Sequence, residues 1–229
     1  MAAYRVCVEA GTAAGGCEVP RVYNATSRAF NATPERSDVF CNWGRAGRDQ
    51  HPINCVSATQ AERFCAWRYP HGGRLPTEDE WEFAAAGTAG RRYPWGDSPA
   101  PTPQNTNLCG SECVSYVDTV GHPRWGWIRP WTDQWETTAS VDALPAAGNT
   151  PEGLVGMGDN VNEWTHTNRG RYTARAGNAT EYSSQQNDRV LRGGAWCGID
   201  ASFVVRVHRR GSDSGSSACA GFRCVGVVR

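Results

Sequence analysis

Residues 73–84 read GRLPTEDEWEFA, and this stretch carries the clearest structural signal in the chain. Thr77 and Glu80 have the spacing of a capping box, in which each side chain accepts the backbone N–H of the other residue. Pro76 precedes that box. The acidic side chains that follow Thr77 interact favourably with the positive, N-terminal end of a helix dipole. Gly87 is a typical helix stop. The stretch therefore predicts a helix that starts at Thr77 and ends before Gly87.

A second helix is predicted over residues 57–67. Ser57 and Gln60 repeat the capping-box spacing at its start. Small or apolar residues then recur at helical intervals and define a buried face, made of Ala58, Ala61 and Cys65. A third, shorter helix is expected from Tyr4 to Glu9, ended by Gly11.

The rest of the chain predicts little regular structure. Strand-like pieces are short, at 190–191, 203–207 and 224–228. Ten tryptophans and 26 glycines favour a fold of many turns with large rings between irregular segments. Because no internal repeat and no long linker interrupts the sequence, we expect one α+β domain over residues 1–229.

Charge and hydropathy exclude several classes of protein. The 229 residues include 23 basic and 23 acidic side chains, and every basic one is arginine. With no basic block, a sequence-independent nucleic-acid binder is not expected. No apolar run reaches the roughly 20 residues needed to cross a bilayer. The lack of lysine excludes a Schiff-base or P-loop lysine.

Ten cysteines favour disulfides, because an even number in a loop-rich chain is typical of them. Cys7 and Cys17 enclose a glycine-rich segment, and Cys109 and Cys113 bracket Gly-Ser-Glu. We expect some disulfides and some buried free thiols, with no metal role. The compartment stays open: the N-terminus has no signal-peptide pattern, whereas the cysteine content is compatible with an extracytoplasmic setting.

Five blocks in a fixed order resemble the formylglycine-generating enzyme (sulfatase-modifying factor) family. They are GRLPTEDEWEFA at 73–84, YPWGD at 93–97, GL with NVNEWT at 153–165, RVLRGGAW at 189–196 and GFRC at 221–224. The resemblance implies a variant C-type-lectin-like fold with two helices, a small twisted antiparallel sheet and much irregular structure. Residues 4–11 resemble an early motif of the family, so the family's first strands are expected to be missing.

Active members of this family oxidise a cysteine of a sulfatase peptide to formylglycine. The resemblance implies that two cysteines, spaced Cys-x4-Cys after the RGG block, bind copper(I), a soft metal that suits thiolates. Cys197 stands near the first position, but five residues further on is Ser202, beside Phe203. A hydroxyl cannot replace a thiolate, so we expect no copper and assign no catalytic residue.

A second enzyme branch of the family uses non-haem iron held by a facial set of histidines. The histidines at 51, 71, 122, 166 and 208 show no paired spacing. An oxidase of the copper or iron type with a degenerate active site therefore stands as the alternative hypothesis.

The resemblance also implies calcium, which prefers six to eight oxygen ligands from carboxylates and backbone carbonyls. A first site would consist of the side chains of Asn107 and Asp133 and the carbonyls of Leu108 and Trp135. The alternative is that both side chains only cap turns.

A second implied calcium site consists of the Glu163 side chain with the carbonyls of Asp159 and Val161. Gly156 stands where the family has Asp or Asn, which removes one charged ligand. The Asp159 side chain can compensate for that loss.

Residues 196–220 form the candidate ligand-binding segment, between the RGGAW and GFRC blocks. An irregular middle between fixed anchors is typical of binding loops on a scaffold. The arrangement resembles the variable proteins of diversity-generating retroelements, in which this stretch is diversified to make new ligand surfaces. The candidate contact residues are Trp196, Cys197, Ile199, Asp200, Ser202, Phe203, His208, Arg210, Ser212 and Asp213.

Within that segment, Phe203, Val205 and Val207 are expected to face the core while the alternate residues face outward. The leading hypothesis is a non-catalytic domain that presents this segment to a protein or other macromolecule. We expect neither a nucleic-acid partner nor a membrane span.

Overall fold

The computed structural model describes residues 1–20, 22–24, 29–31, 39–121, 130–168, 189–197, 205–213 and 215–226. The described helices are α1 (Ala2–Ala10), α2 (Ala58–Arg68), α3 (Glu78–Ala86) and α4 (Ser111–Thr119), with 3-10 turns at Thr12–Ala14, Val141–Ala143 and Ala146–Gly148. The described strands are β1 (Val22–Asn24), β2 (Ala29–Asn31), β3 (Asn162–Asn168), β4 (Arg189–Arg192), β5 (Arg210–Asp213) and β6 (Ala220–Gly221).

The central sheet has the strand order β5-β4-β3-β6, and β1 and β2 form a separate antiparallel pair. β4 runs antiparallel to both β3 and β5, whereas β6 runs parallel to β3. The sheet is therefore mixed, which corrects the expectation of a purely antiparallel one. Because β5 and β6 point the same way at opposite edges, the chain must cross the sheet between them.

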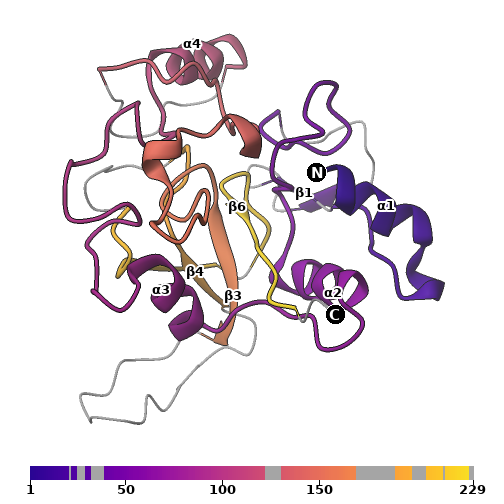
Figure 1. The fold of residues 1–229 in the computed structure, drawn as a ribbon. Helices are drawn as coiled ribbons and strands as arrows, with labels where there is room; N and C mark the ends of the chain where they lie inside the picture. The colour runs from indigo at the N-terminus through magenta and orange to yellow at the C-terminus, as the bar shows by residue number, and fades with distance from the viewer. Residues whose placement is uncertain are drawn as a thin grey trace.

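The two helices with capping boxes form as predicted. In α2 the Ser57 hydroxyl accepts from the Gln60 N–H at 3.3 Å, and Ser57 N–H donates to the Gln60 side chain at 3.0 Å. The corresponding bonds join Thr77 and Glu80 before α3. The buried face of α2 is the predicted one, Ala58, Ala61 and Cys65. Figure 1 shows α2 and α3 flanking β3.

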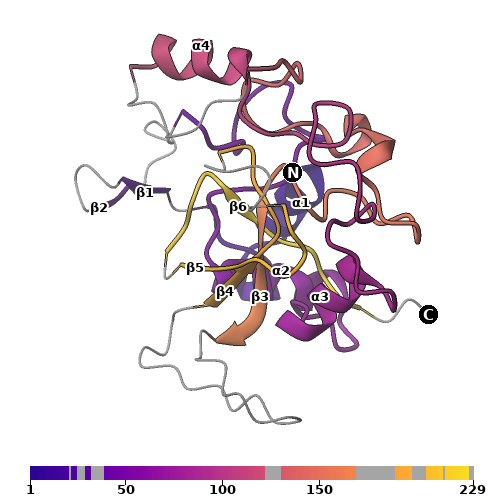
Figure 2. The ribbon, with the colours of Figure 1, turned by 90° about the vertical axis from the view of Figure 1, so that its left-hand side faces the viewer.

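Several elements differ from the sequence-based expectation. α4 was not predicted: it has no side-chain cap, and the loop at 131–134 supports it instead, through Trp131 C=O and Glu112. It lies at the end of the molecule away from α2 and α3 (Figure 2). Of the expected strand at 203–207, the described residues 205–207 form a turn, and 203–204 lie outside the described residues. At 224–226 the chain forms only one bridge, Val225 with Arg74.

Three tryptophans are the largest fully buried side chains of the described core, and each indole N–H has a partner, as buried indoles require. Trp164 donates to Val56 C=O at 2.9 Å, and Trp196 donates to Ala218 C=O at 3.2 Å. Trp81 donates to a carboxylate, that of Glu163, at 2.7 Å. All three side chains are at most 1% exposed.

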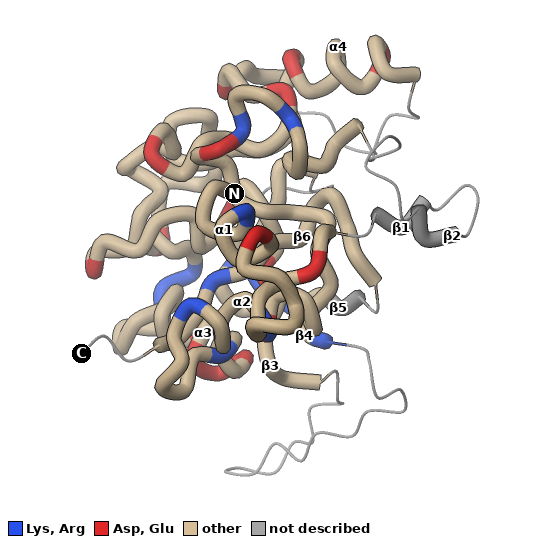
Figure 3. Tube along the Cα trace, turned by 90° about the vertical axis from the view of Figure 1, so that its right-hand side faces the viewer, with Lys and Arg blue, Asp and Glu red and all other residues tan. Residues whose placement is uncertain are grey.

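All ten cysteines are paired, which corrects the expectation of some free thiols. The disulfides are Cys7–Cys17, Cys41–Cys55, Cys65–Cys224, Cys109–Cys113 and Cys197–Cys219. Five disulfides are compatible with an oxidising, extracytoplasmic compartment. Among the described helices, none combines the length and apolar character that a bilayer crossing demands. Acidic and basic positions intermix around α1, α2 and α3 (Figure 3).

The Cys65–Cys224 disulfide closes a loop of 159 residues, against 10 for Cys7–Cys17. Loop-closure entropy then predicts that replacing the first pair by alanine costs about 5 kcal/mol and the second about 3 kcal/mol. Urea unfolding of the two double variants measures the difference. Equal losses of stability would contradict the entropic account.

Candidate functional site

Glu163, on β3, joins three of the sequence blocks. Its carboxylate accepts the Trp81 indole N–H at 2.7 Å and two N–H groups of Arg223, at 2.5 and 2.6 Å. The side chain of Glu163 is 6% exposed and that of Arg223 28%. A buried carboxylate needs such a paired cation, because desolvation of an isolated charge costs several kcal/mol. This contact fixes α3 and the GFRC block against the central strand.

The RGGAW block packs against the backbone of residues 157–160, at the start of the NVNEWT block. A Cβ on Gly194 would lie 2.2 Å from Gly158 C=O, and Gly193 has a φ of +80°, so neither position admits a side chain. Trp196 N–H then donates to Asn160 C=O at 3.0 Å, and Cys109 N–H donates to Trp196 C=O at 2.7 Å. The start of the candidate ligand-binding segment is thereby fixed to the scaffold.

Asn107, Asp133 and Asp159 form one buried polar group in the loop-rich half. Asn107 N–H donates to Asp159 Oδ2 at 2.6 Å, and Leu108 N–H donates to Asp133 Oδ2 at 2.8 Å. Trp135 N–H reaches the other Asp133 oxygen at 3.0 Å. Asn107 Oδ1 is buried and has no hydrogen-bond partner among the described residues. The structure thus brings the residues of the first implied calcium site together and adds the Asp159 side chain to them.

Asp133 and Asp159 form no ion pair with a positive side chain among the described residues, although the charge of Arg223 lowers the pKa of Asp159 in part. Burial raises the pKa of Asp133 from 3.8 to about 6. Burial also raises the pKa of Asp159 from 3.8 to about 7, and the neighbouring charges of Asp133 and Glu163 raise it further. The described residues contain no cluster of three His, Cys, Asp or Glu side chains around one point.

The residues of the second implied calcium site are arranged differently. Both Glu163 oxygens already accept from Arg223, and Asp159 C=O accepts from Val161 N–H at 2.8 Å. The carboxylate charge at this position is therefore balanced by the protein itself.

The candidate ligand-binding segment is held at both ends. Trp196 is fully buried, so it supports the segment from below and presents no surface to a ligand. Cys197 is bonded to Cys219. Before that disulfide, Ser217 C=O accepts from Cys55 N–H at 3.0 Å, and Ala218 C=O accepts from Asn54 Nδ2 at 2.7 Å.

The other candidate contact residues divide into three groups. His208 is 59% exposed at its side chain, and Arg210 is 18% exposed and pairs with Glu78 at 3.0 Å. Ser212 and Asp213 lie on β5. Four positions lie outside the described residues: Ile199, Asp200, Ser202 and Phe203.

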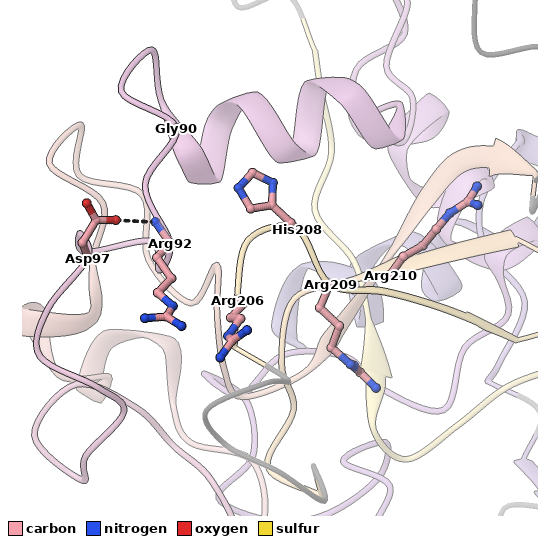
Figure 4. Close-up of a pocket in the computed structure, with 7 residues that line it drawn as sticks. All are labelled: Gly90, Arg92, Asp97, Arg206, His208, Arg209 and Arg210. Carbon is pink, nitrogen blue, oxygen red and sulfur yellow. Dashed lines mark hydrogen bonds between the residues drawn. The ribbon is translucent and has the colours of Figure 1, made fainter. Parts of the chain in front are cut away.

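The sequence pattern did not identify three arginines as candidate contact residues, although the fold places them beside His208 and Arg210. Arg92, Arg206 and Arg209 line a shared pocket with them (Figure 4). Val205 and Val207 are buried as expected, which turns Arg206 and His208 outward. That alternation was a usable signal for Arg206, whereas nothing local in the sequence links it to Arg92.

The raised pKa values predict a pH dependence of stability in EDTA. The folded carboxyls keep protons that unfolded ones have already released, so the free energy of unfolding should fall as pH rises from about 4 to about 7. Asp159→Asn should remove most of this slope, because an amide does not titrate. The amide oxygen can still accept the Asn107 N–H. Urea unfolding at several pH values measures it, with exposed Asp142→Asn as the matched control. An unchanged slope in Asp159→Asn would contradict the assignment.

The comparisons with known proteins agree with this architecture. Residues 1–227 match the family model described as "Sulfatase-modifying factor enzyme 1-like domain". The chain is 34% identical over 186 residues to the inactive C-alpha-formylglycine-generating enzyme 2 of Bos taurus, covering 76% of this chain and 50% of that protein. It is 33% identical over 195 residues to the formylglycine-generating enzyme of Streptomyces coelicolor, covering 82% and 55%.

Solved structures show the same fold. Treponema denticola variable protein 1 aligns with a TM-score of 0.54 at 18% identity, covering 79% of this chain and 73% of that one. PvdO from Pseudomonas aeruginosa aligns with a TM-score of 0.56 at 20% identity, covering 76% and 61%. The chain spans about half the length of the curated relatives it matches. On the strength of the family match and the shared fold, this chain belongs to the sulfatase-modifying factor family.

Proposed function

We propose that this chain is a non-catalytic, ligand-binding member of its family, which presents residues 196–220 to a protein or other macromolecule. The observation that carries the proposal is the Cys197–Cys219 disulfide. Copper(I) chemistry of the family type needs two thiolates, and a sulfur in a disulfide is not a thiolate. With every cysteine paired, the chain has no free thiol to supply either one.

The way the segment is anchored supports a binding role. Trp196 and Ala220 are fully buried at its two ends, whereas Arg206, His208, Arg209 and Arg210 between them reach solvent. Variable polar surface on fixed ends is the usual arrangement of binding loops. The similarity to an inactive C-alpha-formylglycine-generating enzyme 2, and the fold shared with a variable protein of Treponema denticola, are consistent with this proposal.

One observation favours the alternative, an oxidase of the formylglycine-generating type. Folding brings Cys219 next to Cys197, although the sequence spacing predicted no second cysteine there. Reduction of this bond would leave two neighbouring thiolates, a donor set that suits copper(I). The two functions therefore differ in whether the reduced pair supports turnover.

An activity assay on the reduced protein separates them. With copper(I), oxygen and a Cys-x-Pro-x-Arg peptide, we expect no more aldehyde from the natural chain than from Cys197→Ser, because the binding proposal assigns these sulfurs a structural role. Mass spectrometry of the peptide measures the aldehyde. Formation that is lost in Cys197→Ser and kept in Cys7→Ser would establish the oxidase instead.

We further propose a structural calcium ion at the first implied site. Asn107 Oδ1 lies buried without a partner, and the Asp133 and Asp159 carboxylates beside it are desolvated. Side-chain oxygens of this kind, with nearby backbone carbonyls, suit calcium. Leu108 and Trp135 supply those carbonyls in the family pattern. The proposal does not extend to the second site, where Arg223 already balances Glu163.

Calcium should therefore raise the melting temperature at about pH 7.5, since a ligand of the folded state stabilises it by about 3 kcal/mol at a hundredfold excess over its Kd. Asp133→Asn should lose most of this rise, and exposed Asp142→Asn should keep it. Differential scanning calorimetry in calcium and in EDTA checks both. A natural chain that melts at the same temperature in the two buffers would argue against the ion.

A further inference from the structure

A basic pocket of about 420 Å³ lies where the candidate ligand-binding segment meets the loop after α3. Its lining includes four arginines, a histidine and one carboxylate: Arg92, Asp97, Arg206, His208, Arg209 and Arg210. In Figure 4 the side chains of Arg92, Arg206 and Arg209 extend to the same side, while His208 points toward α3. A pocket of this volume matches the size of small-molecule sites.

The backbone fixes these arginines in place. Val205 and Val207 are fully buried and anchor the turn that carries Arg206 and Arg209. Val207 N–H donates to Arg92 C=O at 3.1 Å, which ties this turn to the loop after α3. Arg209 N–H closes the turn on Arg206 C=O at 3.0 Å. The donors thus come from two segments that the fold holds together.

Part of the positive charge around the pocket is already balanced by α3. Glu78 pairs with Arg210 at 3.0 Å, and Glu82 lies 2.9 Å from His208 Nδ1. Both glutamates also pair with the buried Arg192. Glu78 and Glu82 are therefore engaged with Arg192 and with the residues of the pocket lining that they contact.

Arg92 and Arg209 have no such balance. Within the described ranges, neither guanidinium forms an ion pair with a carboxylate. The Cζ atom of Arg92 lies 5.8 Å from the centroid of the Tyr93 ring. The described side-chain contact of Arg209 is with Asn162 Oδ1, at 3.5 Å. Asp97 uses its Oδ1 to accept the backbone N–H of Arg92 at 2.8 Å. Burial lowers the pKa of Arg209, as expected of a cation without an anionic partner.

We propose that this pocket binds a compact tetrahedral oxyanion, the phosphate or sulfate group of a ligand. The inference deepens the proposed binding function and rests on it, because the pocket is built from residues of the 196–220 segment. The described lining of the pocket holds four arginines and one carboxylate, Asp97.

The chemistry of the donors selects this class of ligand. Guanidinium groups present paired N–H donors that match the oxygens of phosphate and sulfate. Donors that approach from two separate segments suit a tetrahedral group, whose oxygens point in several directions, better than a planar monoanionic carboxylate. A phosphate monoester, which is a dianion at neutral pH, also suits the two guanidinium groups, of Arg92 and Arg209, that form no ion pair among the described residues.

Isothermal titration calorimetry with inorganic phosphate and with sulfate, at ionic strength held constant with sodium chloride, tests the proposal. Both ions should bind the natural chain, and Arg209→Gln and Arg92→Gln should each weaken binding about tenfold, since a charge-assisted hydrogen bond is lost. Arg5→Gln, which removes an exposed arginine paired with Asp49 away from the pocket, is the control and should bind like the natural chain.

Asp97→Asn gives a change in the opposite direction. It removes the pocket's own carboxylate charge and keeps an oxygen for the Arg92 N–H, so phosphate should bind several-fold more tightly. Phenyl phosphate and phenyl sulfate, titrated in parallel, tell a phosphorylated ligand from a sulfated one by which binds more tightly.

Three results would overturn the proposal: no heat beyond that of chloride, equal binding by both arginine variants and the natural chain, or tighter binding of glutarate than of phosphate and sulfate. None of these results bears on the aldehyde assay, so failure of the pocket and failure of the non-catalytic function are distinguishable.

Discussion

The carboxylate of Glu163 is the contact on which the other contacts of this fold depend. It sits on the central strand β3 and accepts the indole N–H of Trp81 and two N–H groups of Arg223. A carboxylate that is 6% exposed is tolerated only with such partners, because removing one of them leaves a buried unpaired charge. Three segments far apart in the sequence, α3, β3 and the GFRC block, are therefore positioned by one side chain. The strands β4 and β6 pair with β3 on either side, so their positions follow from that of β3.

The candidate ligand-binding segment follows directly from that arrangement. It leaves β4 through two glycines packed on Met157 and Gly158, and it returns as β6 beside β3. Trp196 and the Cys197–Cys219 disulfide close its base. The same disulfide contains the sulfur of Cys197, so a copper(I) site of the family type at this position would require the bond to be reduced. The fixed ends leave the residues between them as the part of the segment that the proposed binding function uses.

Local signals were enough to predict part of this structure, and non-local contacts decided the rest. Both capping boxes are encoded within four residues, and α2 and α3 form where those residues predict. α4 has no cap and is supported by a loop some 20 residues away through Glu112 and Trp131, so no local pattern identifies it. The family pattern found Asn107 and Asp133, and the fold added Asp159 to them. The arginine pocket joins residue 92 to residues 206–210, a pairing that only the tertiary structure creates.

The proposed non-catalytic function depends on the disulfide between Cys197 and Cys219. The most direct measurement is peptide mapping by mass spectrometry after alkylation of the native, unreduced protein from an oxidising compartment or culture medium. The account predicts no alkylated cysteine and a cross-linked peptide that joins Cys197 to Cys219. Recovery of both residues alkylated, with the other four disulfides intact, would contradict it.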